Sequence, residues 1–295
     1  MGQRSIAFTV VLFLHISSTF AQPTGHDVAQ MRDVLLTAIS DRFSSTTLWE
    51  PTRVPSNQSE QPGGRTAFAV MTLLDAGIPA QRDDLAEAIP KLAAAKMTGT
   101  YAVAARLMAF RRLPIDRRTP MHDDADRLLR AFDSTACGWD YGPVPRSTFV
   151  DQSLTQFCVL ALAEAIDGGA TIDRRLFELV RSRFLALQDP SGGWGYRTND
   201  APRGSMTAAG LATLTLCNDH APQDDRHAAV TSAAIVRASS WLATSFTAKG
   251  NPGSRRWIDY WLLSLERAAR ATGDVRFGSD RWLEAGIKSI ASRLL

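Results

Sequence analysis

The stretch that decides the fold is Gln188-Asp189-Pro190-Ser191-Gly192-Gly193-Trp194-Gly195-Tyr196. Apolar, helix-like segments precede it at 181–187 and follow it at 205–216. A proline and three glycines within nine residues cannot continue a helix, so the stretch predicts a tight loop. The loop nevertheless carries a tryptophan and a tyrosine. We therefore expect Trp194 to fill a gap between neighbouring helices and the Gln188 side chain to bond backbone groups at a helix end.

The start of the chain reads as a secretory signal. Arg4 gives it a positive charge, residues 6–14 are apolar, and residues 19–21 end in a small-residue cleavage site. Residues 1–21 are therefore predicted to be a signal peptide cleaved after Ala21. The mature protein would be exported, to the periplasm or outside the cell, and an uncleaved membrane anchor is the alternative.

Charge and cysteine content exclude several classes of function. The 33 basic and 30 acidic residues nearly balance, and no basic run is interleaved with aromatic residues, which argues against nucleic acid as a partner. Three cysteines without metal-like spacing predict no metal site. Cys158 and Cys217 lie in apolar helical patterns and are expected to be buried thiols, with a Cys137–Cys158 disulfide as the alternative.

A period of two helices per repeat runs along the chain. Trp139 and Trp194 are 55 residues apart, and Ser153 and Ser205 are 52 apart. Charged amphipathic segments are expected at 26–43, 82–96, 122–132, 172–187, 225–246 and 279–295. Nearly apolar segments are expected at 66–76, 100–111, 151–166, 205–217 and 257–270. This pattern predicts an all-α array of five to six helical hairpins, with outer and inner helices joined by Gly/Trp loops.

The residues Gln188, Gly192 and Trp194 match the QW motif, and Gly138 with Trp139 forms a degenerate copy that lacks the glutamine. In this the chain resembles the terpene cyclase and protein prenyltransferase superfamily, including exported bacterial proteins with prenyltransferase or squalene-cyclase repeats. The resemblance covers about residues 60–295 and implies an (α/α) toroid or barrel over 66–295. Residues 22–65, an N-terminal helix and a Pro/Gly-rich loop, are expected to belong to the same domain.

The catalytic residues of that superfamily are missing from the sequence. No Asp-x-Asp-Asp acid of the cyclases occurs, and no cysteine has an aspartate two positions before it, as the prenyltransferase zinc site requires. We therefore expect a binding or scaffold module without a cofactor, which holds an unknown small molecule, lipid or protein partner. The alternatives are an enzyme on isoprenoid or lipid substrates with a non-standard acid, and a carbohydrate-active α/α-barrel enzyme.

Candidate site residues lie where inner helices begin, since those ends of a toroid share one mouth. Asp151 and Asp259 are the candidates for a catalytic acid. The candidate ligand-binding rim consists of polar and aromatic side chains: Gln152, Gln156, Thr207, Tyr260, Tyr196 and Arg203. The structural alternative is that the carboxylates and hydroxyls cap helices and that the tryptophans fasten the repeats.

Three further expectations concern charged residues and the end of the chain. The acidic clusters at 83–87 and 122–126 open predicted helices, so they are expected to be solvated caps. Glu266 and Arg267 are expected to pair between helices. Because a sixth inner helix is lacking, a partner, a dimer or the N-terminal segment is expected to cover an apolar C-terminal flank.

Overall fold

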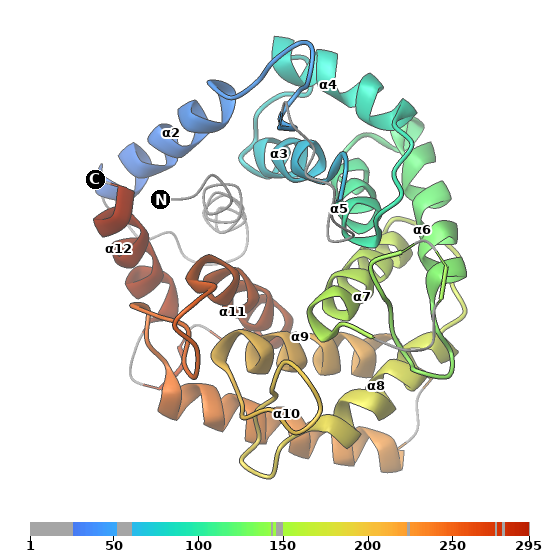
Figure 1. Ribbon diagram of the computed structural model, residues 1–295, viewed down its shortest axis with the longest axis vertical. Helices are drawn as coiled ribbons and strands as arrows, with labels where there is room; N and C mark the ends of the chain where they lie inside the picture. Colours follow the sequence, from blue (N-terminus) through green and yellow to red (C-terminus); the bar gives the residue numbers. More distant parts are fainter. Residues whose placement is uncertain are drawn as a thin grey trace. The chain divides into compact units, whose positions relative to one another are not determined.

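The computed structural model describes residues 26–51, 61–142, 144–145, 150–222, 225–274, 276–278 and 281–294, so the expected signal peptide lies outside it. These residues form eleven α-helices and no β-strand, only two isolated bridges (Figure 1). The helices are α2 (His26–Ser40), α3 (Gly64–Asp75), α4 (Asp83–Ala94), α5 (Thr100–Arg111), the 3-10 helix η2 (Ile115–Arg117), α6 (Thr119–Ala131), α7 (Gln152–Asp167), α8 (Arg175–Leu187), α9 (Gly204–His220), α10 (Asp225–Ser245), α11 (Ile258–Thr272) and α12 (Trp282–Leu294). Each expected helix is present, with its ends within three residues of the prediction. The all-α prediction is confirmed.

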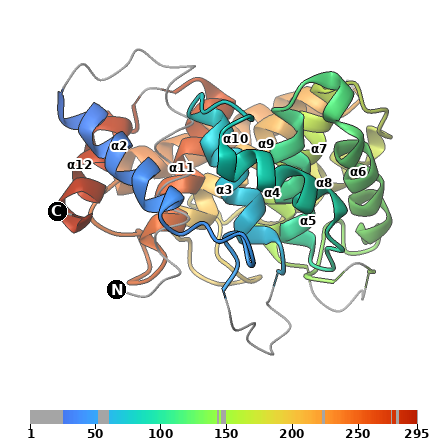
Figure 2. The same cartoon turned by 90° about the horizontal axis from the view of Figure 1, so that it is seen from above.

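The first of two compact units comprises residues up to Asp133, with 139–147 and 161–172. In it, α3 packs against α4 and α5, and α5 packs against α6 (Figures 1 and 2). Residues 102–110 of α5 are all buried, whereas α4 and α6 bury one face each. This difference follows from composition, because a helix that is apolar all round is stable only when neighbours surround it.

The second unit comprises 134–138, 148–160 and the chain from Asp173 onward. Here α9 is the central helix, and α8, α10 and α11 pack around it (Figure 1). All eleven residues 204–214 of α9 are buried. Within the described residues, no helix is long and apolar enough to cross a membrane.

Three tryptophans fasten a loop to the outer helix that precedes it. Each indole N–H donates to a backbone carbonyl oxygen about ten residues earlier and contacts a phenylalanine near the end of the same outer segment. The bonds are Trp49 to Ile39 (2.8 Å), Trp139 to Leu128 (2.7 Å) and Trp194 to Phe184 (2.9 Å), and the aromatic partners are Phe43, Phe132 and Phe184. Sequence reasoning found two of these copies. It missed Trp49, whose loop lacks the glycine and glutamine of the motif.

One residue of the acidic cluster at 122–126 is not the solvated cap that the sequence led us to expect: Asp123 and Asp126 are exposed, but Asp124 is not. Since α6 begins at Thr119, three residues earlier than expected, Asp124 lies inside the helix and is fully buried. Its carboxylate accepts two hydrogen bonds of 2.7 Å from the Arg106 guanidinium of α5. Arg106 also donates to the backbone oxygens of Leu92 and Ala95 near the end of α4, so this pair links three helices.

The cysteines follow the simpler of the two expectations. Within the described residues no disulfide forms: Cys158 and Cys217 are buried thiols, and Cys137 is half-buried. Burial raises the pKa of both buried thiols, to well above its ordinary value for Cys158, so they stay protonated and act as small apolar core residues.

Candidate functional site

The Gln188 side chain connects the Gly/Trp loop to the next outer helix. Its Nε2 donates to the backbone oxygens of Gly192 and Ala234, both at 2.9 Å, and its Oε1 accepts a 2.5 Å bond from Arg237. Ala234 and Arg237 lie within α10, so the glutamine bonds backbone groups as expected but in the body of a helix rather than at its end. The motif glutamine is therefore a repeat-to-repeat fastener.

Two glycines let the loop approach its neighbours closely. Gly192 has a φ of 98°, and a Cβ there would lie 2.5 Å from the backbone oxygen of Arg237. A Cβ on Gly210 of α9 would lie 2.5 Å from the Trp194 ring. Both distances are shorter than real Cβ contacts, so only glycine fits at these positions.

Two expected rim residues, Thr207 and Arg203, help to hold this loop. Thr207 is fully buried, and its Oγ1 accepts a 3.1 Å bond from the Trp194 backbone N–H. Arg203 donates its own backbone N–H to the Trp194 carbonyl, while its side chain is 37% exposed and lies 3.6 Å from Asp200. The structure thus places Thr207 beneath the loop and leaves the Arg203 guanidinium at the surface.

Asp151 caps the inner helix α7. It is 1% exposed, and its Oδ1 accepts bonds from the Ser153 backbone N–H (2.8 Å), the Ser153 hydroxyl (2.6 Å) and the Leu154 N–H (3.0 Å). Its Oδ2 accepts a 2.5 Å bond from the Tyr196 hydroxyl of the Gly/Trp loop. Three of these four bonds converge on Oδ1, as expected of a helix cap, and Oδ2 accepts one.

A second tyrosine belongs to the same polar cluster. Tyr260, in the first turn of α11, donates from its hydroxyl to Gln156 Oε1 of α7 at 3.1 Å. Burial raises the pKa of Tyr260, and the charge of Asp151 raises it further, while the hydroxyls of Ser264 and Ser153 act in the opposite direction. The phenol is therefore held as a neutral donor. The fold thereby brings together Asp151, Tyr196, Gln156 and Tyr260, four of the residues that the sequence proposed for the site.

Gln152 and Gln156 leave polar atoms unsatisfied in this cluster. They are 4% and 1% exposed and lie one turn apart on the same face of α7. Across the described part of the chain, neither Gln152 Oε1 nor Gln156 Nε2 has a hydrogen-bond partner. One acceptor and one donor are thus buried a helical turn apart without a partner in the described chain.

Asp259 immediately precedes Tyr260 in the first turn of α11 and is 9% exposed.

Among the described residues, no group of three or more His, Cys, Asp or Glu side chains could hold a metal ion.

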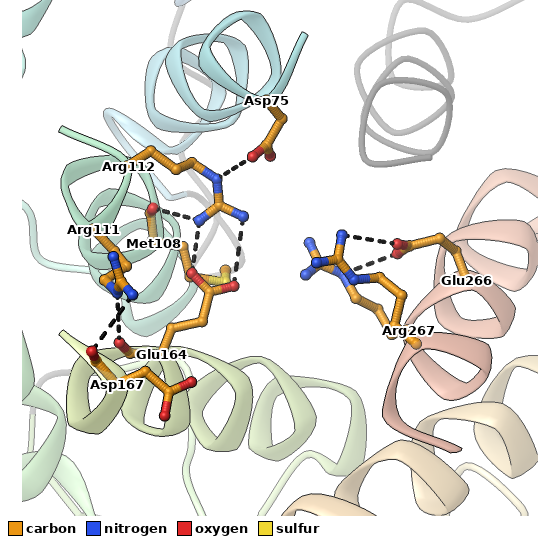
Figure 3. A network of polar contacts seen from close by, with 9 residues as sticks. Asp75, Met108, Arg111, Arg112, Glu164, Asp167, Glu266 and Arg267 are labelled. Carbon is orange, nitrogen blue, oxygen red and sulfur yellow. Dashed lines mark hydrogen bonds and ion pairs between the residues drawn. The ribbon is translucent and has the colours of Figure 1, made fainter. Parts of the chain in front are cut away.

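A separate ionic network belongs to the first unit (Figure 3). Arg112, at the end of α5, pairs with Asp75 of α3 at 2.5 Å and with Glu164 of α7 at 2.6 Å. Burial lowers the pKa of Arg112, but the two carboxylates outweigh this effect and raise it overall. The guanidinium stays charged, and the network joins three inner helices.

The pairing expected of Glu266 needs a correction. Its carboxylate lies 3.4 Å from Arg267 and 3.6 Å from Arg270, and all three residues belong to α11 (Figure 3 shows Glu266 and Arg267). The ion pairs therefore lie within one helix and not between helices. Glu266 and Arg270 are four residues apart, the spacing at which side chains of one helix face each other.

Comparisons with known proteins identify the fold. No protein-family model matches the sequence, and no curated protein matches it significantly. A glycosyl hydrolase family 88 protein from Bacteroides vulgatus has a TM-score of 0.65 at 12% identity, covering 91% of this chain and 90% of that one. The ent-copalyl diphosphate synthase from Streptomyces platensis has 0.62 at 17% identity, covering 92% of this chain but only 50% of that one. The type II terpene cyclase MstE from Scytonema has 0.59 at 14% identity, covering 91% of this chain and 87% of that one.

These similarities establish architecture, because identities of 12–17% say nothing about a shared reaction. This chain spans half the length of the copalyl diphosphate synthase. The chain has the all-helical α/α-toroid fold shared by type II terpene cyclases and α/α-barrel carbohydrate-active proteins, as the sequence resemblance implied.

Proposed function

We propose that this is an exported binding module that holds a hydroxyl-rich ligand at the start of inner helices α7 and α11. One observation carries the proposal: Gln152 Oε1 and Gln156 Nε2 are buried without partners within the described residues. A buried polar atom without a hydrogen bond costs about 1–3 kcal/mol. A sugar hydroxyl both donates and accepts, so it complements this pair of amide atoms.

The state of Asp151 favours binding over catalysis. A general acid needs a proton to give to the substrate, and it must reach the reacting atom directly. The four donors around Asp151 occupy both of its oxygens from within the protein. The carboxylate therefore acts as a helix cap and as an anchor for Tyr196.

We take the hydroxyl-rich ligand to be a glycan, because carbohydrate-active proteins are among the fold neighbours. Two of them are named as a polysaccharide lyase and a glycosyl hydrolase. Others are named as terpene cyclases, which keeps an isoprenoid enzyme with a non-standard acid as the competing reading.

Calorimetric titration with maltohexaose, cellohexaose and N-acetylchitohexaose tests the proposal. The unmodified protein should bind at least one of them, and Gln156→Leu should weaken that binding about tenfold, equivalent to ~1.4 kcal/mol. Gln81→Leu, at an exposed position, is the matched control and should bind normally. Absence of binding, or equal binding by Gln156→Leu, would contradict the proposal.

Mass spectrometry of products separates binding from turnover. Incubation with the same hexasaccharides or with geranylgeranyl diphosphate should leave them unchanged. If the protein converts any of them and Asp151→Asn abolishes the conversion, the enzymatic alternative holds instead.

A further inference from the structure

Trp257 differs from the other tryptophans in the described residues. It is 65% exposed, whereas Trp139, Trp194, Trp261 and Trp282 are buried and the remaining two are half-buried. It precedes α11 directly, and its indole offers a large apolar face to solvent. The exposed indole adds little to the core of this fold, and its open face is available to a partner outside the molecule.

The loop that carries Trp257 is held rigidly from inside. Asn251 is 5% exposed, and its side chain accepts from the Ser205 N–H at 2.9 Å and donates to the Arg256 carbonyl at 3.2 Å. The Gly204 N–H donates to the Pro252 carbonyl at 2.8 Å. These bonds fix the loop to the start of α9. A rigid aromatic loses little conformational entropy when a ligand stacks on it.

The charge around Trp257 is positive. Arg255 and Arg256 precede it and are exposed, and in the described chain neither guanidinium has a hydrogen-bond or ion-pair partner. No acidic residue occurs between 247 and 257, and Asp259, two residues after Trp257, is only 9% exposed. Gly253 of the same loop packs against Pro202 and Arg203, and the Arg203 guanidinium is paired with Asp200, so among the described residues Arg255 and Arg256 supply the unpaired charge here.

We propose that Trp257, Arg255 and Arg256 form a subsite for an acidic glycan, one whose sugar rings carry carboxylates. The indole face stacks on a sugar ring, and the planar guanidinium groups bind a carboxylate through paired N–H donors. The inference rests on the proposed function in that it names the ligand class of the same binding module. Tyr260, one helical turn after Trp257, connects this surface to the cluster at α7.

An anionic membrane is the other partner that basic and aromatic side chains attract. Membrane insertion needs a continuous apolar face beside the aromatic residue. The residues before Trp257 are Gly250, Asn251, Pro252, Gly253, Ser254, Arg255 and Arg256, which supply no such face. A polar, hydrogen-bonding surface with one exposed indole fits a sugar chain better.

Titration with hexagalacturonate tests this inference directly. The unmodified protein should bind it more tightly than maltohexaose, and the affinity should fall as salt is raised. Trp257→Ala and the double variant Arg255→Ala/Arg256→Ala should each bind at least tenfold more weakly. Trp257→Tyr should retain most of the affinity. Arg130→Ala, which removes an exposed charge from α6, should bind normally.

Several results would overturn the inference. The first is that hexagalacturonate does not bind, and the second is that Trp257→Ala binds it with unchanged affinity. The third is that the protein binds vesicles containing 30% phosphatidylglycerol in a way that depends on Trp257, while hexagalacturonate does not bind. The two proposals fail separately. Loss of neutral-glycan binding in Gln156→Leu with no effect of Trp257→Ala leaves only the proposed function. The reverse pattern leaves only the acidic subsite.

Discussion

Replacement of Trp194 by alanine should destabilise the protein strongly. The indole is fully buried, its N–H bonds the Phe184 carbonyl, and its ring lies against Gly210 of α9. Removal of a buried tryptophan side chain costs about 3–5 kcal/mol, because the apolar transfer energy is lost and a cavity remains. Total stabilities are about 5–15 kcal/mol, so the change should move the unfolding midpoint far.

Urea denaturation followed by circular dichroism measures this effect. Trp194→Phe should recover more than half of the loss, since it keeps an aromatic ring and forfeits one hydrogen bond worth about 0.5–1.5 kcal/mol. Trp257→Ala is the matched control, because its side chain is 65% exposed, and it should change stability by no more than about 0.5 kcal/mol. A loss below about 1 kcal/mol in Trp194→Ala would refute its role as a fastener between repeats.

Three further perturbations probe the core and its ionisation. Asp124→Ala should lower the free energy of unfolding, measured by urea denaturation, by about 3–5 kcal/mol, because it leaves Arg106 buried without its carboxylate. A double variant with apolar side chains at both 106 and 124 should recover much of this loss. Equal losses in the single and the double variant would contradict the prediction. In the native protein only Cys137 should react quickly with Ellman's reagent, and all three thiols should react in guanidinium chloride; a second fast native thiol would show that the core opens. Burial raises the pKa of Tyr260 above 10, so the contribution of this phenol to the free energy of unfolding is complete below pH 10 and declines at higher pH, where the unfolded chain loses the phenol proton first. Tyr260→Phe should flatten this alkaline decline in stability between pH 9 and 11.5. An unchanged slope would disprove the link between Tyr260 ionisation and stability.

Part of the polar cluster at the start of α7 could be foreseen from residue types at repeat positions. Asp151, Gln156, Tyr196 and Tyr260 were proposed from their places in the chain, and the fold brings them together. Thr207 was proposed by the same reasoning, yet it lies beneath the Gly/Trp loop. A repeat position specifies which end of a helix a residue occupies, but not which of its neighbours the side chain meets.

The sequence by itself determined the helices, their alternation between charged and apolar types, and the loops that end them. These features depend on local properties: periodic hydrophobicity, proline and glycine, and the spacing of repeated tryptophans. Each acts over a few turns of chain, so each can be read without coordinates.

Only the tertiary structure decided which polar residues are buried and which aromatic is exposed. Asp124 reads as a helix cap but pairs with Arg106 in the core, and Trp257 reads as the start of an apolar helix but faces solvent. Both outcomes depend on segments distant in sequence: α5 meets α6 at Asp124, and the Asn251 loop docks on α9 beside Trp257. Burial and pairing are properties of such long-range contacts, which residue type and period do not specify.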